Sequence, residues 1–279
     1  MPDNGSLLDR VYELINSGKL NLPVYNPVAL RLQQAVSGGS DLGEIERLIV
    51  ADQALSAEVL KAANSPFYCG LSPVRTIRNA MVRLGLEQMR RLVLLVSERT
   101  RYKAQDPQLH KMLAELWRHA STTGLAAQWV AQRLHAAGIE EICFLGGLLH
   151  DIGKLILLRA VDDIKKTDGS PAFLSPALLD ELLLTAHCQV DYKLLKDWNI
   201  PEVYCQIARD HHSENLSAGD LPLVIVRLAN EASKKLGVGL NPNPSLILAA
   251  TPEAGILRAG EILLAELEVM LEDHLAQAA

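Results

Sequence analysis

The chain has 279 residues, of which 49% are hydrophobic and only 4% aromatic, and its formal net charge is −6 at pH 7. A composition rich in Leu, Ala and Val but poor in aromatics favours helices packed on helices over a β-sandwich. The negative charge argues against a protein whose main task is to bind nucleic-acid phosphates, and no run of eighteen apolar residues predicts a membrane span.

The first part of the chain is predicted to be helical. Pro27 is expected at the first position of a helix, and Asp41 with Glu44 is expected to form a capping box for the next helix. The apolar spacing over residues 77–96 predicts a long helix that bends near Gly85. Basic residues on this helix and its exit are interpreted as a solvated face: Arg83, Arg90, Arg91, Arg99, Arg101 and Lys103.

Residues 101–108 form a polar, aperiodic stretch, and we place the boundary between two helical parts there, as residues 1–105 and 106–279. Residues 165–176 are predicted to form a loop, and residues 237–255 an extended excursion rich in Gly, Pro and Asn. Apolar periodicity predicts further helices over residues 113–134, 142–149, 178–184, 191–198, after Pro201, after Pro222 and over residues 256–275. The fold class is therefore expected to be all-α.

The amino terminus and the cysteines indicate the compartment. The first ten residues show neither a basic nor an apolar signal region, so we expect a cytoplasmic protein. Cys69, Cys143, Cys188 and Cys205 have no CxxC spacing and are expected to be reduced thiols in the helix core, so no zinc site built on thiolates is predicted.

The doublet His150-Asp151 interrupts the apolar run GGLLHDIGKL. A buried carboxylate is costly unless a counter-charge or hydrogen bonds offset it, so Asp151 must be exposed, paired or bound to a cation. Lys154, three residues later, is one candidate partner. A metal ion is the other, since adjacent residues can share an ion where a helix end brings both side chains to it.

Further histidines lie in or at the ends of predicted helices: His119 in WRHA, His187 in TAHCQ, and His211 with His212 in RDHHSEN. Imidazole and carboxylate ligands suit divalent iron, manganese, zinc, cobalt or nickel. We therefore expect one or two transition-metal ions in a shared pocket of the later half.

At these residues the sequence resembles the HD superfamily of metal-dependent phosphohydrolases, and more closely the HDOD (HD-related output domain) family of bacterial signalling proteins. The resemblance spans residues 20–235. It rests on DQALSAEVLKAANSPFY, on IRNAMVRLG, on FLGGLLHDIGKL and on the HH pair. It implies a helical N-terminal subdomain packed on an HD-like helical bundle.

The resemblance also implies roles for individual residues. It implies metal ligands at six positions: His119, His150 and Asp151 for a first ion and, in bimetallic relatives, His187, His211 and His212 for a second. In catalytic relatives, Lys154 corresponds to a lysine that faces the substrate phosphate. In an active hydrolase, Asp151 or a histidine would help to position water. The late aspartate of the superfamily is replaced by Asn230 in VIVRLANEAS, and the DGxGYP run of cyclic-dinucleotide phosphodiesterases does not follow the HH pair.

Three functions remain open. The leading hypothesis is a regulatory module that binds a signalling protein or a small ligand, with the metal site kept for structure or sensing. The alternative is an active metal-dependent phosphohydrolase that uses Asp151 and Lys154 as catalytic residues. The third is a helical scaffold whose histidines bind nothing. Neither nucleic acid nor a membrane is expected as a partner.

Overall fold

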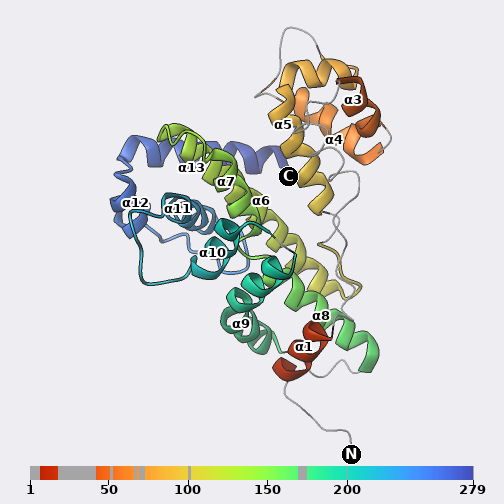
Figure 1. Cartoon of the computed structure of the whole chain (residues 1–279), viewed down its shortest axis with the longest axis vertical. Coiled ribbons are helices and arrows are strands. Elements are labelled where there is room, and N and C mark those ends of the chain that lie inside the picture. Colours follow the sequence, from red (N-terminus) through yellow and green to blue (C-terminus); the bar gives the residue numbers. More distant parts are fainter. Residues whose placement is uncertain are drawn as a thin grey trace, which may run out of the picture. The chain divides into compact units, whose positions relative to one another are not determined.

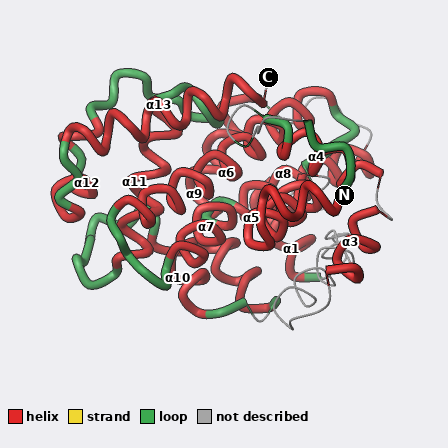
Figure 2. The backbone as a smooth tube through the Cα atoms, turned by 90° about the horizontal axis from the view of Figure 1, so that it is seen from above, coloured by secondary structure: helices red, strands yellow, loops and turns green. Residues whose placement is uncertain are grey.

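The computed structural model describes residues 7–17, 42–50, 53–65, 68, 73–99, 102–168, 175–198 and 200–278. Within these ranges every regular element is a helix (Figure 2), which confirms the predicted all-α class. None of the described helices is long and apolar enough to cross a bilayer. The chain divides into two compact units, one within residues 22–102 and one within residues 1–21 and 103–279.

The unit within residues 22–102 contains α3 (Leu42–Val50), α4 (Gln53–Ala63) and α5 (Ile77–Arg99), which enclose an apolar core. Gly85 interrupts α5 with φ of 76°, a conformation that glycine adopts without strain, and the predicted bend is confirmed. The side chain of Asn64 closes the α4–α5 connection, because it accepts from the Val74 amide at 2.7 Å and donates to the Val74 carbonyl at 2.9 Å. The asparagine of the ANSPFY motif thus has a structural role.

The second unit holds the remaining helices. They are α1 (Leu7–Asn16), α6 (Pro107–Arg133), α7 (Glu140–Leu149), α8 (Ile152–Asp168), α9 (Pro176–Asp197), α10 (Glu202–Asp210), α11 (Leu221–Lys235), α12 (Pro252–Leu257) and α13 (Glu261–Ala278). The long helix α6 packs against α7, α8, α11 and α13, and α9 packs against α8 and α10 (Figure 1). The helices that carry or flank the candidate metal-binding histidines therefore pack against one another.

Two glycines set the spacing of α6 and α7. A Cβ added to Gly147 would lie 2.8 Å from the Cα of Gly124, and one added to Gly124 would lie 2.9 Å from the Phe144 carbonyl oxygen. Only glycine at both positions lets the two backbones approach this closely. The approach holds the end of α7, where His150 lies, beside the part of α6 that carries His119.

Several predicted boundaries differ from the structure. Residues 176–197 form the single helix α9 rather than two, and α8 continues to Asp168, inside the predicted loop. The predicted final helix is two helices, because Arg258 adopts a left-handed conformation that ends α12.

The helix predicted to begin at Pro27 lies outside the described residues. Helix α1 packs on α8, although the sequence-based division had placed it with residues 1–105.

Candidate metal centre

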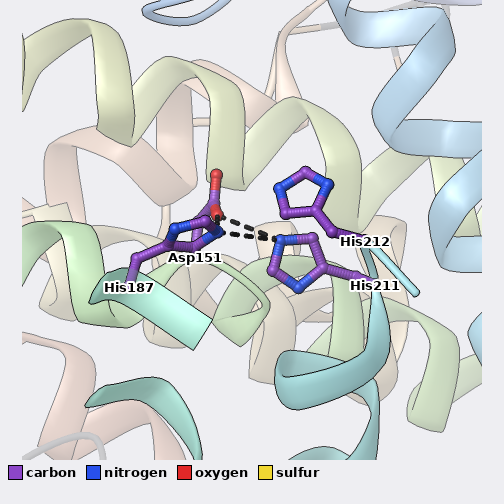
Figure 3. A group of neighbouring side chains, drawn as sticks. All are labelled: Asp151, His187, His211 and His212. Atoms are coloured by element: carbon purple, nitrogen blue, oxygen red, sulfur yellow. Dashed lines mark hydrogen bonds and ion pairs between the residues drawn. The ribbon is translucent and has the colours of Figure 1, made fainter. Parts of the chain in front are cut away.

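The structure brings all six predicted metal-ligand residues together. They come from four places in the second unit: His119 from α6, His150 and Asp151 from the junction of α7 and α8, His187 from α9, and His211 with His212 from the end of α10. Figure 3 shows four of them converging, with Asp151, His187 and His211 pointing toward one another. Five of the six are buried, and only His212 is exposed.

The junction between α7 and α8 explains why both members of the doublet face the cluster. His150 ends α7, and α8 begins at Ile152, so the doublet lies in the turn between the two helices. Gly153, in the first turn of α8, lies against α9, where an added Cβ would be 2.5 Å from the His187 carbonyl oxygen. This close contact places Asp151 next to His187.

Asp151 is common to two groups of candidate ligands, which we call the inner and outer groups. The inner group is His119, His150 and Asp151, and the outer group is Asp151, His187, His211 and His212. Within each group the candidate ligand atoms all lie within 4.8 Å of one another. The two groups of candidate ligands therefore lie next to each other and share one carboxylate.

Each carboxylate oxygen of Asp151 faces a different group. In the inner group, Oδ2 lies 3.4 Å from His150 Nε2 and 3.7 Å from His119 Nε2. In the outer group, Oδ1 lies 3.4 Å from His211 Nε2 and 3.6 Å from His187 Nε2, and these two nitrogens are 3.4 Å apart. Atoms that bind an ion at about 2.1 Å in a tetrahedron are about 3.4 Å from one another, so these spacings fit an ion.

Backbone carbonyls fix the tautomers of three rings. The Nδ1 atoms of His150, His187 and His211 lie 2.7, 2.5 and 2.8 Å from carbonyl oxygens of their own helices. A carbonyl oxygen only accepts, so each Nδ1 carries the proton and each Nε2 keeps its lone pair. That arrangement orients a histidine to bind metal through Nε2.

Four buried side-chain atoms have no hydrogen-bond partner among the described residues: His119 Nδ1, His150 Nε2, Asp151 Oδ1 and Asp191 Oδ2. A buried polar atom left without a partner costs about 1–3 kcal/mol. A cation in the inner group would satisfy His150 Nε2, and one in the outer group would satisfy Asp151 Oδ1. The residues present therefore fit a metal ion.

The electrostatics favour the metal-binding protonation states. Burial lowers the pKa of His119 and of His187 to about 3, so these rings are neutral at neutral pH. Burial alone would raise the pKa of Asp151, but Lys154 and His150 hold it well below its usual range. The cluster thus presents the neutral rings of His119 and His187 around an ionised carboxylate.

The ion pair between Lys154 and Asp151, which the sequence offered as an alternative to a metal site, is present inside the cluster. Lys154 Nζ donates to Asp151 Oδ2 at 2.8 Å. Both residues are largely withdrawn from solvent, and the side chain of Lys154 is 12% exposed. The pair therefore does not place Asp151 at the surface, and it occupies only one of the two carboxylate oxygens.

Asn230 lies buried on α11, at the position where the superfamily resemblance led us to expect a carboxylate. Its side-chain amide donates to Glu231 Oε1 at 3.3 Å. A neutral amide binds a cation more weakly than a carboxylate does. The residue that replaces the superfamily's late aspartate is thus a buried amide that already has a hydrogen-bond partner.

Sequence reasoning missed two residues beside the cluster, Cys188 and Asp191 on α9. Together with His187 and His211 they form a third group of candidate ligands, whose atoms also lie within 4.8 Å of one another. Burial raises the pKa of the Cys188 thiol to about 12, and burial together with Asp151 raises the pKa of Asp191 well above its usual range. The helical spacing of His187 and Asp191, four residues apart, was the signal available in the sequence.

Comparison with known proteins identifies a domain family. The HDOD domain model matches residues 22–214 of the chain. An uncharacterized protein of Treponema pallidum (strain Nichols) is 26% identical over 198 residues, and the match covers 69% of this chain and 38% of that protein. The chain therefore spans less than half the length of this curated relative.

Two crystal structures share the fold along almost the whole chain. An HDOD domain protein of unknown function from Geobacter sulfurreducens has a TM-score of 0.73 at 24% identity, with 99% of this chain and 98% of that chain covered. A candidate metal-dependent phosphohydrolase from Shewanella amazonensis SB2B has a TM-score of 0.69 at 21% identity, with 96% and 97% covered. At these identities the likeness shows the fold alone.

Proposed function

Because the chain belongs to the HDOD family, we propose that it is a regulatory module of bacterial signal transduction, which acts in the cytoplasm by binding a signalling protein or a small ligand. In this proposal a divalent transition metal binds the His/Asp cluster and serves structure or sensing rather than turnover. The proposal is supported by the family and by the charge of the cluster.

The charge of the cluster is the observation that carries the proposal. Asp151 is the one carboxylate in the inner and outer groups, and Lys154 neutralises it at 2.8 Å. The rings of His119 and His187 are neutral, and Asn230 contributes an amide where a carboxylate is expected. Two divalent ions would therefore bring four positive charges into a buried site with no net negative charge, which is strongly unfavourable. A single ion, held mainly by imidazoles, agrees better with this balance.

Metal analysis and a substrate panel test the proposal together. Protein purified without a histidine tag or chelator is expected to retain a single transition-metal ion per chain. That ion should raise the melting temperature, since it binds only the folded state. We expect no turnover of nucleotides, phosphomonoesters or phosphodiesters above the metal-free control. Hydrolysis at enzyme-like rates that is lost in His150→Ala would contradict the regulatory proposal.

A metal-dependent phosphohydrolase is the second candidate, and one specific observation favours it. Asp151 faces both the inner and the outer group, the arrangement in which one carboxylate bridges two ions. Metal ions of this kind supply an activated water and stabilise phosphate charge. Of the chain's own residues, Asp151 would orient that water and Lys154 would bind a phosphate oxygen.

Asn230→Asp separates the two candidates. A carboxylate at this position adds negative charge to the cluster's surroundings, so the phosphohydrolase reading predicts tighter binding of a second ion and a gain of hydrolysis. The regulatory reading predicts tighter metal binding without turnover. Asn230→Leu, which removes the polar group at similar volume, is the matched control and should bind metal no better than the parent.

A further inference from the structure

Three neighbouring residues of α9 and one from the end of α10 form a group of donors that includes sulfur. They are His187, Cys188, Asp191 and His211, and their candidate ligand atoms all lie within 4.8 Å of one another. The group shares His187 and His211 with the outer group but replaces Asp151 and His212 by Cys188 and Asp191. We propose that it is a separate cation position, selective for a thiophilic divalent ion such as Zn²⁺.

The geometry of α9 aims the three side chains at one point. His187 and Asp191 are one helical turn apart and lie on the same face. Cys188 Sγ lies 3.2 Å from His187 Nε2, the ring atom that keeps its lone pair because Nδ1 is bound to the Leu183 carbonyl. Without a cation the thiol donates to that nitrogen. With a cation, sulfur and nitrogen both become ligands. The protons of the thiol and of Asp191, whose raised pKa favours the neutral acid, are then released to solvent.

Asp191 gives an independent indication of a ligand. Its side chain is completely buried. Oδ1 accepts a hydrogen bond from the Gly153 amide at the start of α8, but Oδ2 has no partner among the described residues. Capping α8 requires only one of the two oxygens. A bound cation accounts for the other oxygen, which otherwise carries the cost of an unsatisfied buried acceptor.

The donor set determines which ions suit this position. Two imidazoles, one thiolate and one carboxylate match the four-coordinate sites that bind Zn²⁺ or Co²⁺, whereas Mg²⁺ and Ca²⁺ prefer oxygen ligands and Mn²⁺ disfavours sulfur. His187 and His211 each have a single Nε2 lone pair, so each can bind one ion at a time. An ion bound by Cys188 and Asp191 together with these two histidines therefore prevents a second ion from binding the outer group, and an ion in the outer group prevents binding at Cys188 and Asp191.

The exclusion makes the cluster able to distinguish metals. A thiophilic ion is expected to move toward Cys188 and Asp191 and to leave Asp151 with only the inner group. A harder ion is expected to remain with Asp151 and His212. This inference holds whether the chain is a regulatory module or a hydrolase, because it concerns only which donors bind which ion.

Cobalt spectroscopy of the 279-residue chain tests the proposal. Co²⁺ added to metal-free protein should produce the near-ultraviolet charge-transfer band of a cobalt–thiolate bond. The band should disappear in Cys188→Ser but persist in Cys205→Ser, which removes a buried thiol outside the group. A parent protein that binds Co²⁺ without this band, or a band that survives in Cys188→Ser, would overturn the proposal.

Asp191→Asn gives a second and independent measurement. The amide oxygen can still accept from Gly153, so the start of α8 is preserved while the ligand charge is lost. Loss of an outer partner alone typically costs about 10- to 100-fold in metal affinity, so we expect Zn²⁺ affinity to fall at least about tenfold. Mn²⁺ affinity should change less than Zn²⁺ affinity. Equal losses for both ions would show that Asp191 acts only on the fold.

Discussion

The inner and outer groups share Asp151 but differ in charge and in access. In the inner group, the carboxylate oxygen Oδ2 is already bound to Lys154, and every member is buried. In the outer group, Oδ1 has no hydrogen-bond partner within the described part of the chain, and His212 is exposed to solvent. The same carboxylate thus offers one neutralised oxygen and one available oxygen. We therefore expect a cation arriving from solvent to bind the outer group first.

The largest effect is expected from removing the shared carboxylate. Asp151→Ala deprives both groups of their only anionic ligand, so we expect binding of Mn²⁺, which disfavours the sulfur-containing group, to be lost and the melting temperature to stop responding to added Mn²⁺. Elemental analysis and calorimetry measure the two effects. His110→Ala, which changes an exposed histidine on α6 outside both groups, should bind metal like the parent. Retention of Mn²⁺ binding at the parent's level by Asp151→Ala would contradict the shared role.

Lys154→Met tests the neutralisation of Oδ2. Breaking a buried ion pair by removing one partner typically costs about 3–5 kcal/mol, and we expect a loss toward the lower end because Lys154 is 12% exposed. The freed oxygen should then favour a cation in the inner group. Urea unfolding with and without Zn²⁺ should therefore show a larger metal-induced stabilisation in the variant than in the parent. An equal stabilisation in both would show that Lys154 does not compete with the ion.

Acid titration of the metal-free protein tests the buried imidazoles. Burial lowers the pKa of His119 and His187 from 6.5 to about 3. In this interval the unfolded chain binds protons that the folded protein does not, so the free energy of unfolding should be largest above pH 6.5 and fall as the pH drops toward 3. Urea unfolding at stepped pH measures the slope, which His119→Gln should reduce. Stability that rises on acidification through this interval would contradict the predicted burial.

The smallest effect is expected at the exposed edge of the outer group. His212→Ala removes one candidate ligand, so metal affinity should fall by about tenfold. The free energy of unfolding without metal should change by less than about 0.5 kcal/mol because the side chain is exposed. Competition with a chelator measures the affinity. An unchanged affinity for metal would mean that His212 lies beside the ion site but is not a ligand.

Much of this arrangement could be predicted from single residues and short motifs. The apolar periodicity indicated an all-α chain, and Gly85 marked a bend because glycine favours conformations that end a regular helix turn. The isolated His150-Asp151 doublet pointed to a buried polar site. The other histidines were also visible in the sequence, and the HDOD resemblance assigned them to one site. Their convergence depends on tertiary packing, which periodicity does not encode.

Other features could not be read from the sequence. Residues 184–191 show no helix-breaking signal strong enough to decide between one helix and two, and packing on α8 and α10 makes α9 continuous. Arg258 ends α12 in a left-handed conformation that its residue type does not predict. Cys188 was interpreted as a core thiol because burial is the usual fate of cysteine. Its position beside His187 depends on where α9 meets α10.

The contact between Gly124 and Gly147 has a consequence for how the chain can vary. A single methyl group at either position would meet backbone atoms of the other helix at 2.8–2.9 Å. The helices would have to separate, and His119 would move away from the doublet although no polar residue had changed. We therefore expect substitution of either glycine by alanine to abolish cation binding while leaving a folded, all-helical protein. The width of one carbon atom decides whether the candidate ligands lie close enough together to bind an ion.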